Sequence, residues 1–164
     1  MKYLVRTLLA MIFAAGPAMA GDDYDMKNVK YPVDGIMTGG QPSLVDVDQL
    51  ARDGVKVIIN LRPEGEYDQQ AIREKANAAG IKHITVPVAG AGGITIDNAR
   101  RLDEILKEIG DSKSLIHCAS GNRAGALLAV RAYYVQGMDK EESLAFGKAA
   151  GMTSLAKRVE NMMK

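Results

Sequence analysis

The chain has 164 residues and a mass of 17.6 kDa, which suits a single domain with at most a short appendage. Hydrophobic residues make up 47% and charged residues 25% of it, so the composition excludes a disordered or fibrous protein. The 21 Lys and Arg nearly balance the 20 Asp and Glu, which argues against nucleic acid as a partner, and the one Cys excludes an internal disulfide or a zinc site of several thiolates.

Residues 1–20 have the pattern of a secretory signal peptide. Lys2 and Arg6 precede an uncharged apolar run, and Ala18 and Ala20 place small residues where a signal peptidase cuts. The apolar run is shorter than the ~20 residues that cross a bilayer, although an uncleaved N-terminal anchor is the alternative. We therefore expect cleavage after Ala20, export to a bacterial periplasm or a similar compartment, and no stable membrane insertion afterwards.

The remaining chain alternates between strand and helix patterns after a polar segment, 21–34, that is expected to be irregular. Short runs rich in β-branched residues predict strands at 36–38, 55–61, 81–88 and 114–118. Apolar residues at helical spacing predict helices at 43–52, 67–79, 97–109, 123–136, 139–150 and 153–163. Ser43, Asp97 and Asp139 are the expected N-caps.

This alternation predicts a single α/β domain over residues 35–164, with a mainly parallel central sheet flanked by helices. Ligands of such sheets bind beyond the carboxyl ends of the strands. The loop that follows the fourth predicted strand is therefore the first place to expect a functional site.

That loop, HCASGNRAG over residues 117–125, contains the only Cys of the chain and an Arg at the start of a predicted helix. A helix N-terminus has unpaired amides and partial positive charge, and amides of a short loop can form an anion-binding nest. A thiol in such surroundings becomes a nucleophile, and a guanidinium offers a planar fork for two oxygens of an anion. Cys118 and Arg123 are therefore candidate catalytic residues; a buried structural Cys beside a surface Arg is the alternative.

The loop resembles the His-Cys-x5-Arg signature of the cysteine-dependent phosphatases and also the active loop of rhodanese-type sulfurtransferases. Cys118 and Arg123 have four residues between them, one fewer than the phosphatase signature and the same number as many rhodanese loops. Ala124 follows the Arg, where phosphatases usually have Ser or Thr. Both departures disfavour fast phosphatase chemistry.

The wider chain resembles the atypical dual-specificity phosphatases of the protein tyrosine phosphatase superfamily. The Gly-Gly-Gln-Pro-Ser turn at 39–43 and the segment LARDGVKVIINLRPEGE at 50–66 resemble their opening, and residues 133–151 resemble their C-terminal helical pair. The whole pattern, over about residues 30–155, most resembles the bacterial family called beta-lactamase hydrolase-like protein, phosphatase-like domain.

This resemblance implies a phosphatase-like fold, with Cys118 as the nucleophile, Arg123 as the oxyanion clamp and no need for a cofactor or metal. His117 stands directly before the nucleophile, where the resemblance implies that it orients the loop; a structural role at the end of the strand is the alternative. His83 is expected to be structural. The loop residues whose backbone amides complete the expected substrate cradle are Ala119, Ser120, Gly121, Asn122 and Arg123.

The general acid that protonates a leaving oxygen has no clear candidate in the sequence. In dual-specificity phosphatases an Asp follows a strand like 85–88, but this chain has the glycine-rich residues 89–93 there. Asp97 is the nearest candidate. The acidic residues of the loop after Arg62 could also reach the site or be solvated loop charges: Glu64, Glu66 and Asp68.

Three functions remain open at this point, and each takes a phosphorylated or sulfur-oxyanion ligand. A phosphatase-like hydrolase would pass through a cysteinyl-phosphate, and the resemblance of the whole chain favours it. A rhodanese-like sulfurtransferase would use a Cys118 persulfide and need no general acid, and the loop length favours it. A catalytically weak anion-binding module is favoured by Ala124 and by the missing acid.

Overall fold

The computed structural model describes residues 24–164, so the predicted signal peptide lies outside the described residues. The described chain contains a five-stranded sheet in the order β1-β2-β5-β3-β4. Its strands are β1 (Lys30–Val33), β2 (Ile36–Gly39), β3 (Val57–Asn60), β4 (Lys82–Thr85) and β5 (Ser114–His117). Neighbouring strands are parallel except for β1, which pairs antiparallel with β2. The predicted α/β fold with a mainly parallel sheet is confirmed.

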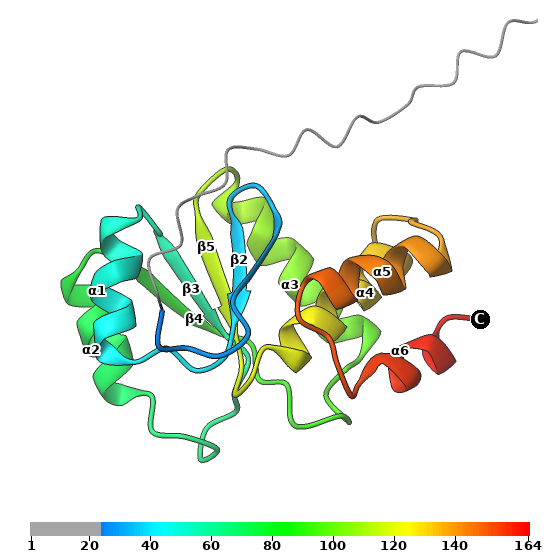
Figure 1. The fold of residues 1–164 in the computed structure, drawn as a ribbon, viewed down its shortest axis with the longest axis horizontal. Helices are drawn as coiled ribbons and strands as arrows, with labels where there is room; N and C mark the ends of the chain where they lie inside the picture. Colours follow the sequence, from blue (N-terminus) through cyan, green and yellow to red (C-terminus); the bar gives the residue numbers. More distant parts are fainter. Residues whose placement is uncertain (1–23) are drawn as a thin grey trace, which may run out of the picture.

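Helices cover both faces of this sheet (Figure 1). They are α1 (Leu44–Arg52), α2 (Gln70–Ala78), α3 (Ile96–Ile109), α4 (Asn122–Tyr134), α5 (Lys140–Ala149) and α6 (Ala156–Met162). Figure 1 shows α1 and α2 on one side of the sheet and α3, α4, α5 and α6 on the other.

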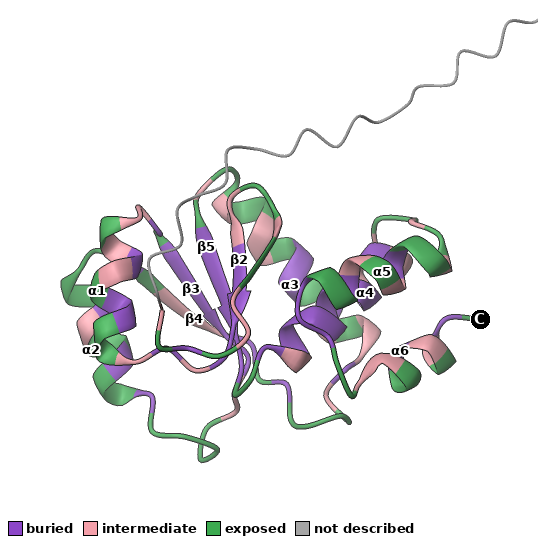
Figure 2. Ribbon diagram, in the orientation of Figure 1, coloured by how far each residue is buried: buried purple, intermediate pink, exposed green. Residues whose placement is uncertain are grey.

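The central strands β3 and β5 are buried along their whole length (Figure 2), as their unbroken aliphatic runs predict for strands covered on both faces. Successive strand residues point to opposite faces. Ile58 and Leu115 accordingly belong to the core beneath α1 and α2, whereas Ile59 and Ile116 belong to the core beneath α3 and α4. Burial of each such side chain contributes about 1.5–3 kcal/mol to folding.

On the second face, α4 and α5 pack at very short distance. A Cβ atom on Gly125 of α4 would lie 2.2 Å from the backbone nitrogen of Met152, and one on Gly147 of α5 would lie 2.5 Å from the Cβ of Ala129. The glycines therefore permit a backbone approach that any side chain would prevent. This seam fixes the position of α4, the helix that carries Arg123.

Two sequence-based expectations are corrected by the structure. The segment 21–34, expected to be irregular, contains the edge strand β1, in which Pro32 is tolerated because an edge strand can leave an N–H position unpaired. Thr95, not Asp97, is the N-cap of α3: Thr95 is extended, and its hydroxyl accepts a hydrogen bond from the Asn98 amide at 3.1 Å. Asp97 consequently lies in the first turn of the helix.

The other predicted caps are confirmed. The Ser43 side chain accepts from the Asp46 amide, and the Asp46 carboxylate accepts from the Ser43 amide, which forms a capping box. Asp139 accepts a hydrogen bond from the Glu142 amide at the start of α5. Within residues 24–164, no helix combines the length and the apolar character needed to cross a membrane.

Candidate active site

Cys118 follows β5 directly, at the carboxyl edge of the sheet where the parallel fold predicts a ligand site. It is a free cysteine with an exposed fraction of 1%, and it lies in the wall of a cavity of about 360 Å³. The residues that line this cavity are Glu66, Gly90, Ala91, Cys118, Ala119, Ser120, Asn122, Arg123 and Leu155. The cavity thus brings the predicted nucleophile and the predicted clamp together.

The turn from the loop into α4 depends on Gly121, the N-cap of that helix. Its φ of +84° is left-handed, a conformation that glycine adopts without the steric cost of a Cβ. Arg123 therefore falls in the first turn of α4, a few residues after Cys118. The glycine therefore lets the loop turn directly into the helix that carries Arg123.

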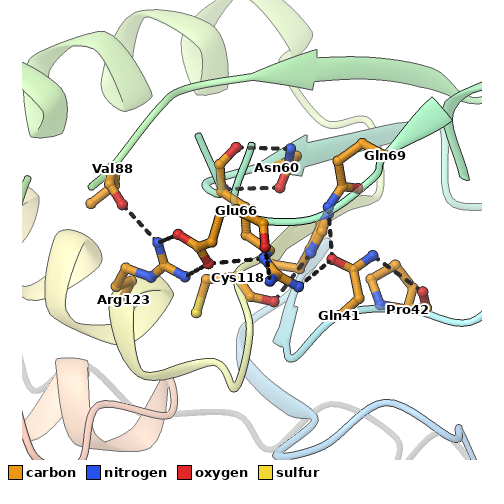
Figure 3. Close-up of polar contacts among 10 residues, drawn as sticks. Gln41, Pro42, Asn60, Glu66, Gln69, Val88, Cys118 and Arg123 are labelled. Atoms are coloured by element: carbon orange, nitrogen blue, oxygen red, sulfur yellow. Dashed lines mark hydrogen bonds and ion pairs between the residues drawn. The ribbon is translucent and has the colours of Figure 1, made fainter. Parts of the chain in front are cut away.

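The Arg123 guanidinium is almost buried and is held by two partners. Nη1 donates to Glu66 Oε2 at 2.8 Å and to the Val88 carbonyl at 2.7 Å, while Nη2 donates to Glu66 Oε1. The pKa of Arg123 is raised, first by the hydrogen bond to Glu66 and also by interaction with Cys118. Figure 3 shows the sulfur of Cys118 beside this guanidinium. The Glu66 carboxylate and the Val88 carbonyl therefore fix the orientation of the guanidinium that lies beside the thiol.

Glu66 is the acidic residue of the cavity wall. Its carboxylate accepts from Arg123 and, at 2.9 Å, from Arg62 Nε, and the hydrogen bond with Arg123 is the largest cause of its lowered pKa. Glu66 is therefore an exposed but ion-paired residue of the site, and not the unpaired loop charge that its sequence context allows. Because it is held ionised, it has no proton to give to a leaving group in this arrangement.

A polar network connects Glu66 with two of the three segments that resemble dual-specificity phosphatases, 39–43 and 50–66. Arg62 Nη1 donates to Gln41 Oε1 at 3.2 Å, and Gln69 Nε2 donates to the same oxygen at 2.8 Å. The Arg62 guanidinium also lies over the Tyr67 ring, 4.5 Å from its centroid. No motif in the sequence predicts this network, although Gln41 and Arg62 both follow strands that flank β5.

The two histidines are neutral. Burial lowers the pKa of His117 to about 3 and that of His83 to about 4. His117 is fully buried, with Nδ1 3.4 Å from the Cys118 carbonyl oxygen. Neither His117 nor Gly121 is among the lining residues of the cavity, whereas the other predicted cradle residues are. His117 therefore packs behind the thiol without adding positive charge to the site.

Asp97, the predicted general acid, lies apart from this site. Its side chain is 92% exposed and pairs with Arg100 at 3.5 Å, and it does not line the cavity. Glu64 and Asp68 are exposed, and Asp68 accepts a hydrogen bond from the Gln70 amide at 2.9 Å. Over residues 24–164, no three His, Cys, Asp or Glu side chains are grouped to hold a metal ion.

Known proteins resemble this chain in sequence and in fold. The sequence profile of the family described as "DSP-PTPase phosphatase fused to NAD+ Kinase" matches residues 20–164. The chain belongs to this family. The DSP-PTPase match covers both the Cys118–Arg123 loop and the segment that contributes Glu66.

Curated relatives of this DSP-PTPase family member are named beta-lactamase hydrolase-like proteins. The one from Xylella fastidiosa is 34% identical over 120 residues, which cover 71% of this chain and 27% of the relative. The one from Agrobacterium fabrum is 33% identical over 120 residues. The chain therefore spans about a quarter of the length of these relatives.

Solved structures confirm the phosphatase-like fold of the DSP-PTPase chain. A DUF442 protein from Shewanella putrefaciens matches 84% of this chain and 91% of its own, with a TM-score of 0.67 and 15% identity. The core catalytic domain of the PP-IP phosphatase SIW14 from S. cerevisiae matches 85% and 86%, with a TM-score of 0.66 and 23% identity. At these identities the likeness shows the shared fold.

Proposed function

We propose that this DSP-PTPase chain hydrolyses phosphomonoesters, with Cys118 as the nucleophile. The observation that carries the proposal is the position of the thiol beside the Arg123 guanidinium in the wall of one cavity. A guanidinium and loop amides in this position suit the charge that develops on the oxygens of a transferring phosphoryl group.

The proposed reaction has two steps. The Cys118 thiolate attacks phosphorus, a sulfur–phosphorus bond forms, and the ester P–O bond breaks with its electron pair on the leaving oxygen, which takes a proton. Water then attacks the cysteinyl-phosphate, the sulfur–phosphorus bond breaks, and inorganic phosphate leaves as the thiolate is restored. Arg123 stabilises the phosphoryl oxygens in both steps.

The proton for the leaving oxygen comes from water or from a group outside the present cavity wall. Glu66 is held ionised by two guanidiniums and serves to orient Arg123. Asp97 keeps its predicted role as the acid only if the residues that precede α3 move it to the cavity. Substrates with good leaving groups, such as aryl phosphates, are therefore the best first choice for an assay.

The alternative function is sulfur transfer. The four-residue spacing between Cys118 and Arg123, together with the ionised state of Glu66, favours it, since this reaction needs no general acid. The thiolate would attack the outer sulfur of thiosulfate, the S–S bond would break, and sulfite would leave. Cyanide would then take the sulfur from the persulfide as thiocyanate and restore the thiolate.

One paired assay separates these functions. The chain from residue 21 onward and its Cys118→Ser variant are given an aryl phosphate in one reaction and thiosulfate with cyanide in another. Phosphate release that depends on Cys118 supports the hydrolase, whereas thiocyanate formation that depends on Cys118 overturns it in favour of sulfur transfer. Binding of phosphate without either turnover indicates the anion-binding module. We also propose export of the protein, on the sequence pattern of residues 1–20.

A further inference from the structure

Asn28 has the most unusual backbone conformation outside the glycines. Its φ is +56°, and within residues 24–164 it is the only residue other than glycine with a positive φ. Asn tolerates this left-handed region better than most side chains, yet the conformation still has a steric cost. Residues kept in such conformations are concentrated at functional sites, where the surrounding contacts compensate for the strain.

The Asn28 side chain joins three distant segments of the chain. Its Nδ2 donates to the carbonyl of Ser120 at 3.1 Å and to the carbonyl of Gly151 at 3.0 Å. Ser120 is in the Cys118–Arg123 loop, and Gly151 is in the turn between α5 and α6. An amide nitrogen has two hydrogens, so both donors of Asn28 are used in these bonds.

The partners of Asn28 are shaped to receive it. Gly121 and Gly151 have φ values of +84° and +97°, and a Cβ on either would lie 2.8 Å from Asn28 Nδ2. Three left-handed residues from three segments therefore pack together at the back of the loop. Because Gly121 is the N-cap of α4, this cluster lies where the loop turns into the helix that carries Arg123.

A second contact fastens the same loop beside Asn28. The Gln41 amide donates to the Ala119 carbonyl at 3.4 Å, and the Gly40 amide donates to the Lys27 carbonyl at 2.7 Å. Lys27, next to Asn28 in the sequence, therefore binds the segment Gly40–Gln41, which in turn binds the loop at Ala119. Two successive carbonyls of the loop, at Ala119 and Ser120, therefore accept hydrogen bonds from residues outside the loop.

We propose that Asn28 is a positioning residue that holds the peptide group between Ser120 and Gly121, and thereby sets how Arg123 faces Cys118. The thiol and the guanidinium belong to opposite ends of one short loop, so rotation of a peptide between them changes their relative position. Asn28 restrains that rotation through a bond to the Ser120 carbonyl. The inference rests on the proposed function only where turnover is measured.

The test uses two substitutions and a matched control. Asn28→Gly keeps the left-handed backbone without strain and removes the amide, whereas Asn28→Asp keeps the side-chain shape but cannot donate to two carbonyls. Asn77→Asp, at an exposed position near the end of α2, introduces the same charge away from the site. Thermal unfolding verifies that each variant is folded.

Two readouts are independent of turnover. Hydrogen exchange of the peptide covering residues 118–123 is compared with that of β3 and β5. Because the chain has one Cys, its alkylation by iodoacetamide reports Cys118 alone, and protection by inorganic phosphate measures anion binding. For both Asn28 variants we expect faster exchange confined to residues 118–123. We also expect about a tenfold rise in the phosphate concentration that halves alkylation, the effect of losing one or two hydrogen bonds. Asn77→Asp should leave both unchanged.

Turnover of an aryl phosphate completes the test. We expect kcat to fall about tenfold in both Asn28 variants, since the loss of one or two hydrogen bonds misplaces the clamp. The proposal is overturned if exchange in residues 118–123 is unchanged, or if it rises equally in β3 and β5, because the side chain would then contribute only to general stability. If the unsubstituted protein releases no phosphate and gains no protection, the proposed function fails, and the exchange measurement still decides the role of Asn28.

Discussion

The two walls of the cavity differ in how firmly they are held. The Cys118–Arg123 wall lies at the end of a fully buried strand and is fastened from behind by Asn28, Gln41 and the α4–α5 seam. The opposite wall contains the exposed residues 89–92, which are held by local turns such as the bond from the Gly93 amide to the Ala89 carbonyl at 2.9 Å. Glu66 and the Val88 carbonyl connect the two walls, because both bind Arg123. The thiol and the guanidinium therefore lie in the wall with more anchoring contacts, and the exposed residues 89–92 form the wall with fewer.

Arg123→Lys should give the largest loss of activity. A lysine ammonium can pair with Glu66 but cannot present two parallel N–H donors to an oxyanion. We expect kcat/KM for an aryl phosphate to fall about a hundredfold, the range typical of losing a donor to a developing oxyanion. Steady-state kinetics and inhibition by phosphate measure the effect. A fall under threefold would show that activity does not require the two parallel N–H donors of the guanidinium.

The buried histidines predict a steep loss of stability in mild acid. The pKa values of His117 and His83 are lowered to about 3 and 4 in the folded chain, so both histidines take up protons on unfolding. The stability that this adds is complete above pH ~6.5 and is lost as pH falls toward 4. Near pH 5 the equilibrium constant for unfolding should rise almost a hundredfold for each unit by which the pH falls, because almost two protons bind on unfolding. Urea unfolding at pH 7, 6 and 5 measures the free energy of unfolding. A free energy that does not change with pH would contradict the burial of the two histidines in their neutral form.

Glu66→Gln should lower kcat/KM about tenfold. The amide keeps the shape of the side chain but loses the charge that aligns Arg123. Because the pKa of Glu66 is lowered, its stabilising contribution is present above pH ~4.5 and is lost as pH falls below that value, so the two proteins should converge in stability in acid. Glu64→Gln, at an exposed neighbouring position, is the control. Higher activity in Glu66→Gln would mean that the carboxylate blocks the clamp.

Gly93→Ala should lower kcat/KM about fivefold, since the added Cβ would lie 2.4 Å from the Ala89 nitrogen and 2.8 Å from the Val88 carbonyl carbon. The resulting shift moves the Val88 carbonyl away from Arg123. Gly92→Ala is the matched control, because its Cβ would approach no atom closer than 3.8 Å. Kinetics of both variants with the same aryl phosphate test whether a shift in residues 88–93 alters the position of Arg123. Equal kcat/KM values for the two variants would show that it does not.

Asp97→Asn should have the smallest effect, less than about twofold on kcat. The side chain is 92% exposed and paired with Arg100, so it contributes little to the cavity. A panel of aryl phosphates with different leaving groups measures the effect. If the variant instead loses activity mainly on poor leaving groups, Asp97 acts as the acid and the exposed wall closes during the reaction.

The alternation of strands and helices was readable from the sequence because short β-branched runs and capped amphipathic segments follow one another. The reactive loop was readable for a similar reason: Cys118, Gly121 and Arg123 lie within six consecutive residues at a predicted strand-to-helix turn. Such local patterns need no knowledge of which segments meet in space.

The remaining features depend on contacts between distant segments. Glu66 pairs with Arg123 across 57 positions, and Asn28 reaches Ser120 across 92, so neither pairing follows from spacing along the chain. They require the strand order, in which β5 lies between β2 and β3. The two local errors have another cause: β1 is a four-residue strand with a proline, and Thr95 and Asp97 are both good N-cap residues.

The close approach of α4 and α5 has a practical consequence for engineering. Any library that varies Gly125 or Gly147 would push two backbones apart, and most of its members would lose the alignment of Arg123 with Cys118 without gaining a new contact with substrate. Diversification for bulkier ligands should instead begin at Ala91, an exposed residue that borders the cavity.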